Sequence, residues 1–344
     1  CAGWSLARYN KRLITMQFRT RIEIKPFEQK IDHRSRILSL GSCFATSVAE
    51  RLLRAKFDVT ASPTGILFNP ESIAAAIERF DAVSRSDRGS LPSAEDLCYG
   101  NGRYFSFDFH SDFSHSDANQ ALTQMREAVE AGAKAVTEAD TIIITFGTAF
   151  VYRLRQNGEV VANCHKQPQA NFVKEMLSVE EIASRYKALI DGILADKQII
   201  FTLSPVRHLG DGLEQNSLSK STARVAIDSI VRSCHNAHYF PSYEILVDEL
   251  RDYRFYADDM AHPARVAIDY IWQRFGEAAF GIETRTLNEK IEKIIRAAEH
   301  RPFSGQSEEH RNFCRRMMAE IEALERQHPQ LKFEQEKATF GTYL

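Results

Sequence analysis

The chain has 344 residues, of which 44% are hydrophobic and 26% charged, the composition of a globular protein rather than of a disordered one. Its 44 lysines and arginines against 46 aspartates and glutamates leave a net charge of −2, so no basic field favours nucleic acid as a partner. No apolar run approaches the roughly 20 residues of a membrane-spanning helix, so we expect no membrane span.

The cysteines and the first residues bear on the compartment. The six cysteines include no C-x-x-C pair, which argues against a zinc site or a disulfide framework and favours reduced thiols. Cys1 suits either a lipid-anchored periplasmic protein or a sequence whose natural start is Met16. The stretch before Met16 is basic and poor in linker residues, unlike a lipoprotein tether. We therefore expect a cytoplasmic protein with an N-terminal extension over residues 1–17.

From Arg36 onward, short β-rich runs alternate with amphipathic stretches, which predicts a parallel sheet flanked by helices. The expected strands cover residues 37–40, 57–60, 141–146, 198–203 and 239–240. The expected helices cover residues 43–55, 70–80, 118–138, 178–195, 218–237 and 262–278.

Two polar segments interrupt this alternation and predict insertions beside the sheet. The first covers residues 81–116, and the second covers residues 150–177 and contains the hairpin turn Asn157-Gly158. After about Glu283 the composition turns to Glu, Lys, Arg, Gln and Ala, with helical spacing over residues 285–327. We expect residues 283–344 to be a C-terminal helical appendage.

Three of the expected strands end in small, polar loops, namely Gly41-Ser42, Gly147-Thr148 and Ser204-Pro205. The carboxyl ends of parallel strands lie on one edge of a sheet, which is where such sheets bind ligands. We therefore expect the functional site at this edge.

Ser42 is the first candidate for chemistry, because it lies between a strand and a helix. Its hydroxyl can project at the sheet edge beside helical N–H groups that favour an oxyanion, which suits an acyl-transfer nucleophile if a base reaches it. The plainer interpretation is a helix N-cap. The neighbouring Cys43 is a rival nucleophile, although a small cysteine in a helix usually turns into the core.

The base is predicted by Asp259-Met260-Ala261-His262, directly before the last helix of the sheet domain. Asp259 can accept a hydrogen bond from one imidazole nitrogen and hold the tautomer whose other nitrogen is basic. Asp258 is the rival carboxylate. Because Ser42 and His262 follow the first and last strands, a doubly wound sheet can bring them together.

Gly41-Ser42-Cys43-Phe44-Ala45 spells the name motif of the GSCFA family, and the chain resembles this family, which belongs to the SGNH/GDSL hydrolase superfamily. The likeness covers residues 18–280. Besides the name motif, it rests on residues 63–70, 146–152, 163–168, 204–208, 217–220 and 239–263. It implies a catalytic domain over residues 18–282 with a three-layer α/β/α, flavodoxin-like fold. It also implies hydrolysis or transfer of an acyl ester, and we expect the reaction to need no metal and no cofactor.

The resemblance implies Ser42 as nucleophile, His262 as base and Asp259 as the residue that orients His262. It assigns the backbone N–H of Gly65 to the oxyanion hole.

The second oxyanion donor is less clear from the resemblance. The superfamily has an asparagine in the loop after the third strand, where this chain has Gly147-Thr148. We expect Thr148, or else Asn69 or Asn163 from a neighbouring loop, to take its place.

Other polar residues lie in the same loops. His165 and His208 could line the pocket, bind an acidic group or act as an alternative base, and Lys220 could lie in solvent or reach back to the site. A metal-dependent hydrolase that uses His165, His208, Asp211 and His262 is an alternative.

Together these features predict a serine hydrolase that acts on small acyl esters or O-acetylated carbohydrates. The insertions supply aromatic side chains for stacking on a sugar, namely Tyr104, Phe105, Phe107 and Tyr152. An O-acyltransferase on the same residues is the near alternative, which a dry, lidded pocket would favour. A ligand-binding module without turnover is a second alternative, which is favoured because the chain lacks the asparagine that the superfamily has after the third strand. No nucleic-acid partner is expected, and the oligomeric state is left open.

Overall fold

Five parallel strands form the central sheet of the computed structural model, which describes residues 19–300 and 307–344; the extension expected at 1–17 lies outside the described residues. The strands are β1 (Arg36–Gly41), β2 (Asp58–Ala61), β5 (Thr141–Phe146), β9 (Gln198–Leu203) and β10 (Ala237–Phe240). Their order is β10-β9-β5-β1-β2, the flavodoxin-like order, with every neighbouring pair parallel. Each strand lies where the sequence predicts one.

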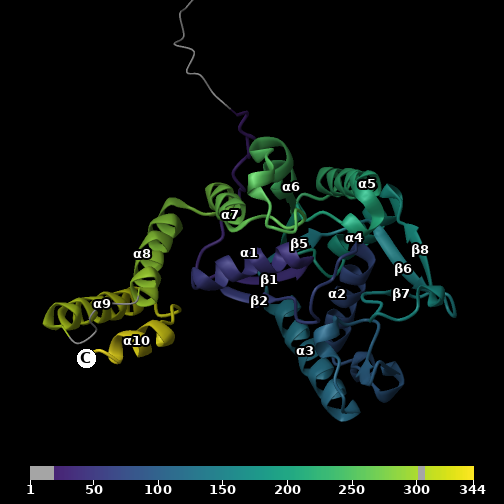
Figure 1. Cartoon of the computed structure of the whole chain (residues 1–344), viewed down its shortest axis with the longest axis horizontal. Coiled ribbons are helices and arrows are strands. Elements are labelled where there is room, and N and C mark those ends of the chain that lie inside the picture. The colour runs from purple at the N-terminus through teal and green to yellow at the C-terminus, as the bar shows by residue number, and fades with distance from the viewer. Residues whose placement is uncertain (1–18, 301–306) are drawn as a thin grey trace, which may run out of the picture.

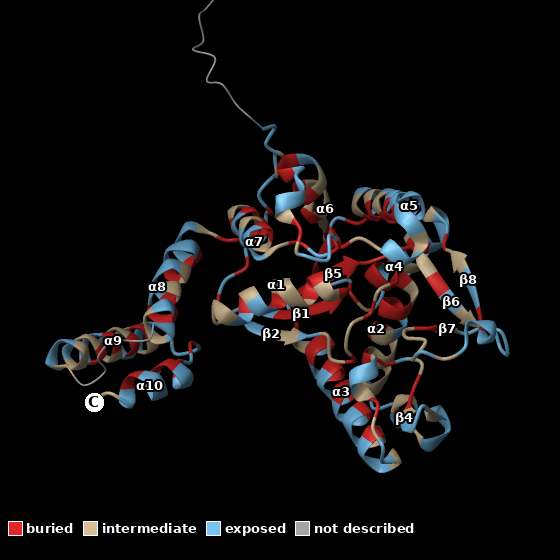
Figure 2. Cartoon of the chain, in the orientation of Figure 1, coloured by how far each residue is buried: buried red, intermediate tan, exposed pale blue. Residues whose placement is uncertain are grey.

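Helices cover both faces of this sheet (Figure 1). On one face lie α2 (Pro70–Ser84), α3 (Ala118–Glu138), α4 (Val179–Asp191) and α5 (Gly212–Ser233), and on the other α1 (Cys43–Arg54) and α7 (Arg265–Ala279). Alternate residues of one strand point to opposite faces, so Ile142 and Ile144 pack in the first core and Ile143 packs in the second. Figure 2 shows these buried strands in the middle of the molecule. The predicted three-layer α/β/α fold is confirmed.

Some helix boundaries differ from those predicted. α5 begins at Gly212 rather than at residue 218. The sequence does not predict its first turns, because Leu213 and Leu218 are exposed and these turns lack an apolar face. α7 begins at Arg265, which leaves His262 in the preceding loop rather than at the helix start. Between β10 and α7, the short α6 (Ser242–Glu244) runs into a π-helical segment at Ile245–Leu250 that the sequence does not predict. Short 3₁₀ turns lie at Arg88–Ser90, Ala94–Asp96, Ser111–Phe113, Gln169–Asn171, Leu209–Asp211 and Tyr253–Phe255.

The two insertions form small antiparallel sheets. β3 (Cys98–Gly100) and β4 (Arg103–Phe105) make a hairpin, and β6 (Phe150–Leu154) pairs with β7 (Val160–Val161) and β8 (Phe172–Met176). The predicted turn at Asn157-Gly158 joins β6 to β7, with Gly158 at φ +79°.

The C-terminal appendage consists of α8 (Ile282–Glu299), α9 (Glu308–Gln327) and α10 (Glu334–Gly341), to one side of the sheet domain (Figure 1). The three helices have a core of their own, separate from the two cores of the sheet domain. This third core includes Ile291, Cys314, Ile321, Phe333 and Phe340. In the described part of the chain, no helix has the length and apolar character that crossing a membrane requires.

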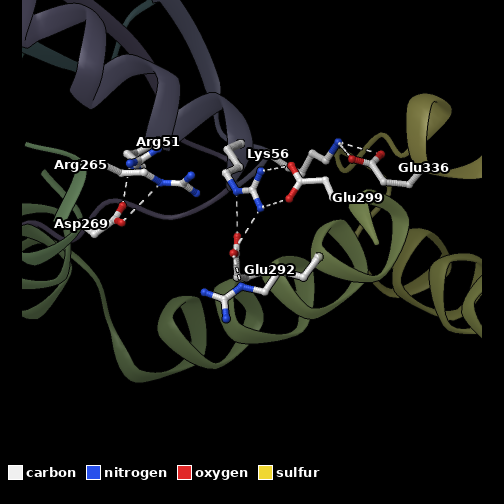
Figure 3. Close-up of polar contacts among 9 residues, drawn as sticks. Arg51, Lys56, Arg265, Asp269, Glu292, Glu299 and Glu336 are labelled. Atoms are coloured by element: carbon white, nitrogen blue, oxygen red, sulfur yellow. Dashed lines mark hydrogen bonds and ion pairs between the residues drawn. The ribbon is translucent and has the colours of Figure 1, made fainter. Parts of the chain in front are cut away.

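Ion pairs join the appendage to the end of α1 (Figure 3). The Arg54 guanidinium lies 3.0 Å from a carboxylate oxygen of Glu292 and 2.9 Å from one of Glu299, both on α8. Lys56 Nζ lies 2.8 Å from Glu336 Oε1 on α10. The opposite end of α1 carries Cys43, so this helix connects the appendage to the carboxyl edge of the sheet.

Candidate active site

A tight turn after β1 places Ser42 and Cys43 at the carboxyl edge of the sheet. Gly41 has φ +135°, and a Cβ there would lie 2.2 Å from Thr145 O on the neighbouring β5. Only glycine fits this turn, because the backbone conformation and the close approach both exclude a side chain. The Ser42 N–H donates to the same Thr145 carbonyl at 3.2 Å. The first residue of α1 is therefore Cys43.

Asp259 and His262 form the contact that their spacing predicts. Asp259 Oδ2 lies 2.6 Å from His262 Nδ1, and Oδ1 accepts the backbone N–H groups of Ala261 and His262, each at 2.9 Å. The hydrogen bonds from these two backbone groups, and then from the ring, lower the pKa of Asp259 to about 2. A carboxylate can only accept, so His262 Nδ1 carries the proton and Nε2 is left as the basic nitrogen.

The second ring nitrogen of His262, Nε2, contacts Cys43. The distance from Cys43 Sγ to His262 Nε2 is 3.6 Å. Burial raises the pKa of the Cys43 thiol, while Lys220 and the N–H groups of Phe44 and Cys43 oppose this change. Cys43 is therefore a thiol at neutral pH unless a base removes its proton, and His262 is placed to do so.

Ser42 makes no hydrogen bond through its side chain within the described part of the chain. Its side chain is buried. It occupies the N-cap position of α1 without making a capping hydrogen bond. A Cβ at Gly147 would lie 3.1 Å from Ser42 Cβ, so the loop after β5 covers Ser42.

The N–H groups predicted for the oxyanion hole are already bonded. The Gly65 N–H donates to Ser62 O at 2.8 Å, in a turn where Gly65 has φ +85°. The N–H groups of Gly147 and Thr148 both donate to Phe68 O, at 2.8 and 3.0 Å. The Thr148 hydroxyl lies 2.8 Å from the Ser219 hydroxyl. None of these groups is free to bind a substrate oxygen without rearrangement.

The two asparagines offered for the same role also have local partners. Asn69 caps α2, where its Oδ1 accepts the Ser72 N–H at 2.8 Å and its amide donates to Ser72 Oγ at 3.0 Å. Asn163 Oδ1 accepts the His165 N–H at 2.8 Å. By contrast, the N–H groups of Cys43 and Phe44 open α1, lack acceptors within the helix and lie close enough to Cys43 Sγ to lower its pKa.

The two histidines differ in their surroundings. His165 holds the insertions together, because its Nε2 donates to Ser106 O at 2.8 Å and to Phe109 O at 3.0 Å. His208 lies near the site: burial first, and then the charge of Lys220, lower its pKa to about 4, and His262 contributes in the same direction. His208 is therefore a neutral imidazole beside the reactive residues.

Lys220 reaches back to the site, the second of the two positions considered from the sequence. It is buried, and its ammonium donates to Gly147 O and to Ser204 O, each at 2.6 Å. The sequence analysis considered Cys43 only as a rival nucleophile and gave Lys220 no role in the reaction. The sequence signal for Cys43 was its position one residue beyond the turn, where a helix begins.

The residues of the metal-dependent alternative do not meet. His165 is bonded to the first insertion, and Asp211 pairs with Lys174. Within residues 19–300 and 307–344, no three His, Cys, Asp or Glu side chains form a group that could hold a metal ion.

Comparison with known families covers most of the chain. The model of the GSCFA family matches residues 36–275, and the model described as the GSCFA domain protein, C-terminal domain, matches residues 291–344. No curated protein matches the chain significantly. The first match spans the sheet with its reactive edge, and the second covers most of the helical appendage. The chain belongs to the GSCFA family.

Proposed function

We propose that this protein is a cysteine-dependent hydrolase of acyl esters, with Cys43 as nucleophile, His262 as base and Asp259 as the residue that orients His262. The observation that carries the proposal is the continuous contact from Cys43 Sγ to His262 Nε2 at 3.6 Å and from His262 Nδ1 to Asp259 Oδ2 at 2.6 Å. A nucleophile, a base and an orienting carboxylate in this order are the requirements of covalent acyl transfer. Membership of the SGNH/GDSL superfamily stays a prediction, which the strand order and the Asp259–His262 spacing support.

The reaction runs in two steps. His262 Nε2 takes the thiol proton, the Cys43 sulfur attacks the ester carbonyl carbon, and the C–O bond breaks as His262 returns the proton to the leaving alcohol. The product on the enzyme is a thioester. Water, deprotonated by His262, then attacks the thioester carbonyl, which releases the acid and restores the thiol.

The oxyanion of each tetrahedral intermediate needs donors beside Cys43 Sγ. The N–H groups of Cys43 and Phe44 fit this role, because they are the first two of α1 and the positive end of the helix dipole favours negative charge there. In this proposal they replace Gly65 and the second donor, for which the sequence analysis offered Thr148, Asn69 or Asn163.

Exposure of the site favours hydrolysis over transfer to another acceptor. The side chains of Asp259 and His262 are 51% and 50% exposed, so water reaches the base directly. An acyltransferase needs a drier site that protects the thioester from water.

The aromatic residues predicted to stack on a sugar are only partly available. Phe105 is buried and packs against His165, and Phe107 packs against Phe172. Tyr152 remains exposed, so small acyl esters and O-acetylated sugars both stay in the proposal.

The test compares three variants on a panel of 4-nitrophenyl acyl esters and O-acetylated sugars. Cys43→Ala abolishes turnover, and Cys43→Ser lowers it strongly because a serine hydroxyl is a weaker acid than a thiol. Ser42→Ala retains turnover, because replacing a buried hydroxyl that has no partner disturbs little. Mass spectrometry of the wild-type protein finds the acyl group on the Cys43 peptide. Turnover that survives Cys43→Ala and disappears in Ser42→Ala would return the nucleophile to Ser42.

A further inference from the structure

The loop that carries Asp259 and His262 is closed at its base by backbone contacts. Tyr256 and Pro263 form an antiparallel β-bridge, and the Ala257 N–H donates to His262 O at 2.8 Å. The reactive pair therefore lies at the tip of a narrow loop, and its position depends on what holds that tip.

The two peptide groups that precede His262 are bound on one side by Asp259. Their N–H groups, which belong to Ala261 and His262, donate to Asp259 Oδ1, each at 2.9 Å. The other side of these peptide groups consists of the Met260 and Ala261 carbonyls. Met260 has φ +56°, a left-handed conformation that a residue with a side chain adopts rarely, so the tip needs surrounding contacts to hold its shape.

Arg207, in the loop after β9, binds both of these carbonyls. Its backbone N–H donates to Ala261 O at 3.1 Å, and its Nη1 donates to Met260 O at 3.3 Å. Its guanidinium carbon lies 3.9 Å from the centre of the Tyr256 ring, at the base of the same loop. Each of the two peptide groups is thus held at its N–H by Asp259 and at its carbonyl by Arg207.

No ion pair accounts for this arginine. Its guanidinium contacts the Met260 carbonyl and the rings of Tyr256 and Tyr253, and no carboxylate in the described part of the chain pairs with it. Stacking on an aromatic face fixes the plane of a guanidinium and leaves its N–H groups able to donate. A hydrogen bond to a carbonyl polarises the peptide group and strengthens the bond that its N–H makes. Arg207 therefore acts on Asp259 through the peptide groups between them.

We propose that Arg207 is a positioning residue that holds Asp259 Oδ2 against His262 Nδ1 and so keeps the proton off Nε2. The inference rests on the proposed role of His262 as base and deepens it, and it does not depend on which residue is the nucleophile. The 2.6 Å contact between Asp259 and His262 joins two side chains that are about half exposed, so packing around them does not fix it. The bonds from Arg207 supply the rigidity that burial supplies in a closed site.

The test combines steady-state kinetics with nitrogen NMR of the full chain, isotopically labelled at its histidines. The nitrogen shifts of a neutral imidazole show which ring nitrogen carries the proton, and His262→Gln assigns the signals of His262. We expect Arg207→Ala to reduce the share of His262 that carries its proton on Nδ1. We also expect kcat to fall by about 10- to 100-fold, the size of loss that a small misplacement of a reacting group causes. KM should stay close to that of the wild type, since Arg207 does not bind the substrate.

Two further variants separate positioning from a general loss of structure. Arg207→Lys keeps a cationic donor for Met260 O but loses the planar face that stacks on Tyr256, so we expect the same changes to a smaller extent. It retains most of the side chain if Arg207→Ala folds poorly. In an Asp259→Asn background, Arg207→Ala should reduce kcat little further, because its effect passes through Asp259.

Arg155→Ala is the matched control. The Arg155 guanidinium also donates to backbone carbonyls, to Ala170 O at 3.1 Å and to Phe172 O at 3.3 Å, but within the second insertion. Its removal leaves kcat and the tautomer of His262 unchanged. The inference is overturned by an unchanged tautomer in Arg207→Ala, by a loss that appears in KM alone, or by losses that multiply with those of Asp259→Asn.

The failure of the proposed function has a different signature. If the wild type turns over no ester, the proposed function is wrong, but the tautomer of His262 still reports whether Arg207 holds Asp259 in place, because NMR needs no turnover. If the wild type forms the acyl group on Cys43 and the tautomer is the same in Arg207→Ala, the proposed function stands and the role of Arg207 is wrong.

Discussion

Lys56 and Glu336 are 280 residues apart in the sequence, and their side chains meet with both carboxylate oxygens within 2.9 Å of Lys56 Nζ. Lys56 follows α1, whose first residue is Cys43, and Glu336 lies on α10 of the appendage. The side chains are 16% and 7% exposed, so the pair is largely removed from water. The Lys56 ammonium also lies 5.2 Å from the centre of the Phe333 ring. The appendage is thus fixed to the helix that carries the reactive thiol.

Removing one partner of this pair should destabilise the protein. We expect Glu336→Gln to lower the free energy of unfolding by about 1–3 kcal/mol, because it leaves the Lys56 ammonium largely buried without an anion. Urea unfolding measures the change. Glu308→Gln is the control, since Glu308 pairs with Arg311 at the surface, where water screens the charges and the loss of the pair has little effect on stability. Equal effects of the two substitutions would contradict the burial of the Lys56–Glu336 pair.

A second prediction concerns the turn before Cys43. Gly41→Ala should destabilise the protein by clearly more than the roughly 1–2 kcal/mol of a left-handed backbone alone, because the new Cβ would meet Thr145 O at 2.2 Å. Gly158→Ala is the matched control: Gly158 has φ +79° with no atom within 4 Å of the added Cβ, so only the backbone term applies. Urea unfolding of both variants separates the contact from the conformation, and a Gly41→Ala protein as stable as Gly158→Ala would refute the close approach.

The sheet could be predicted from the sequence because its three central strands, β1, β5 and β9, are short, apolar and almost wholly buried. β5 and β9 are six-residue runs without an exposed position, and such runs between helical stretches admit few other structures. The start of α5 could not be predicted in the same way, since Leu213 and Leu218 face solvent and give no amphipathic pattern. The π-helical segment at Ile245–Leu250 has no sequence signal of its own.

The candidate site was predictable to within one residue. Asp259 and His262 meet because their spacing of three closes a local turn, and local geometry follows from sequence. The choice between Ser42 and Cys43 depends on which residue starts the helix and on the packing of Gly147 against Ser42, a contact between segments 105 positions apart. The burial of Lys220 could not be predicted either, because a lysine within a helix has the sequence pattern of an exposed charge and only tertiary packing shows that it is buried.

Asp259→Asn should lower kcat by a factor on the order of 10⁴, the size of effect seen when a triad histidine is held in the wrong tautomer. The asparagine amide can donate to His262 Nδ1, which then leaves the proton on Nε2, facing Cys43. Steady-state kinetics measure the loss. Asp258→Asn is the control on the neighbouring carboxylate and should leave kcat close to that of the wild type. The reverse pattern would make Asp258 the orienting residue.

Cys43 and His262 should behave as one unit. We expect the double variant Cys43→Ala/His262→Ala to have nearly the same residual kcat/KM as Cys43→Ala alone, because a base has no task once the thiol is gone. The three rates form a double-mutant cycle on one ester substrate. Losses that multiply would show that His262 acts independently of Cys43, for example by binding the substrate.

The last prediction is the pH dependence of stability that follows from Lys220. Its pKa is lowered to about 7 in the folded protein, whereas an exposed lysine in the unfolded chain keeps its ordinary value near 10.5. Below pH 7 the ammonium is charged in both states, and the folded protein bears the full cost of burying it. Between pH 7 and pH 10.5 the folded state loses the proton while the unfolded state keeps it, so the unfolded state binds more protons and stability rises with pH. In Lys220→Met this contribution is absent. The free energy of unfolding of the wild type, measured in urea relative to Lys220→Met, should therefore increase steadily from pH 7 to pH 10. A difference that stays constant over this range would mean that Lys220 keeps its charge in the folded protein.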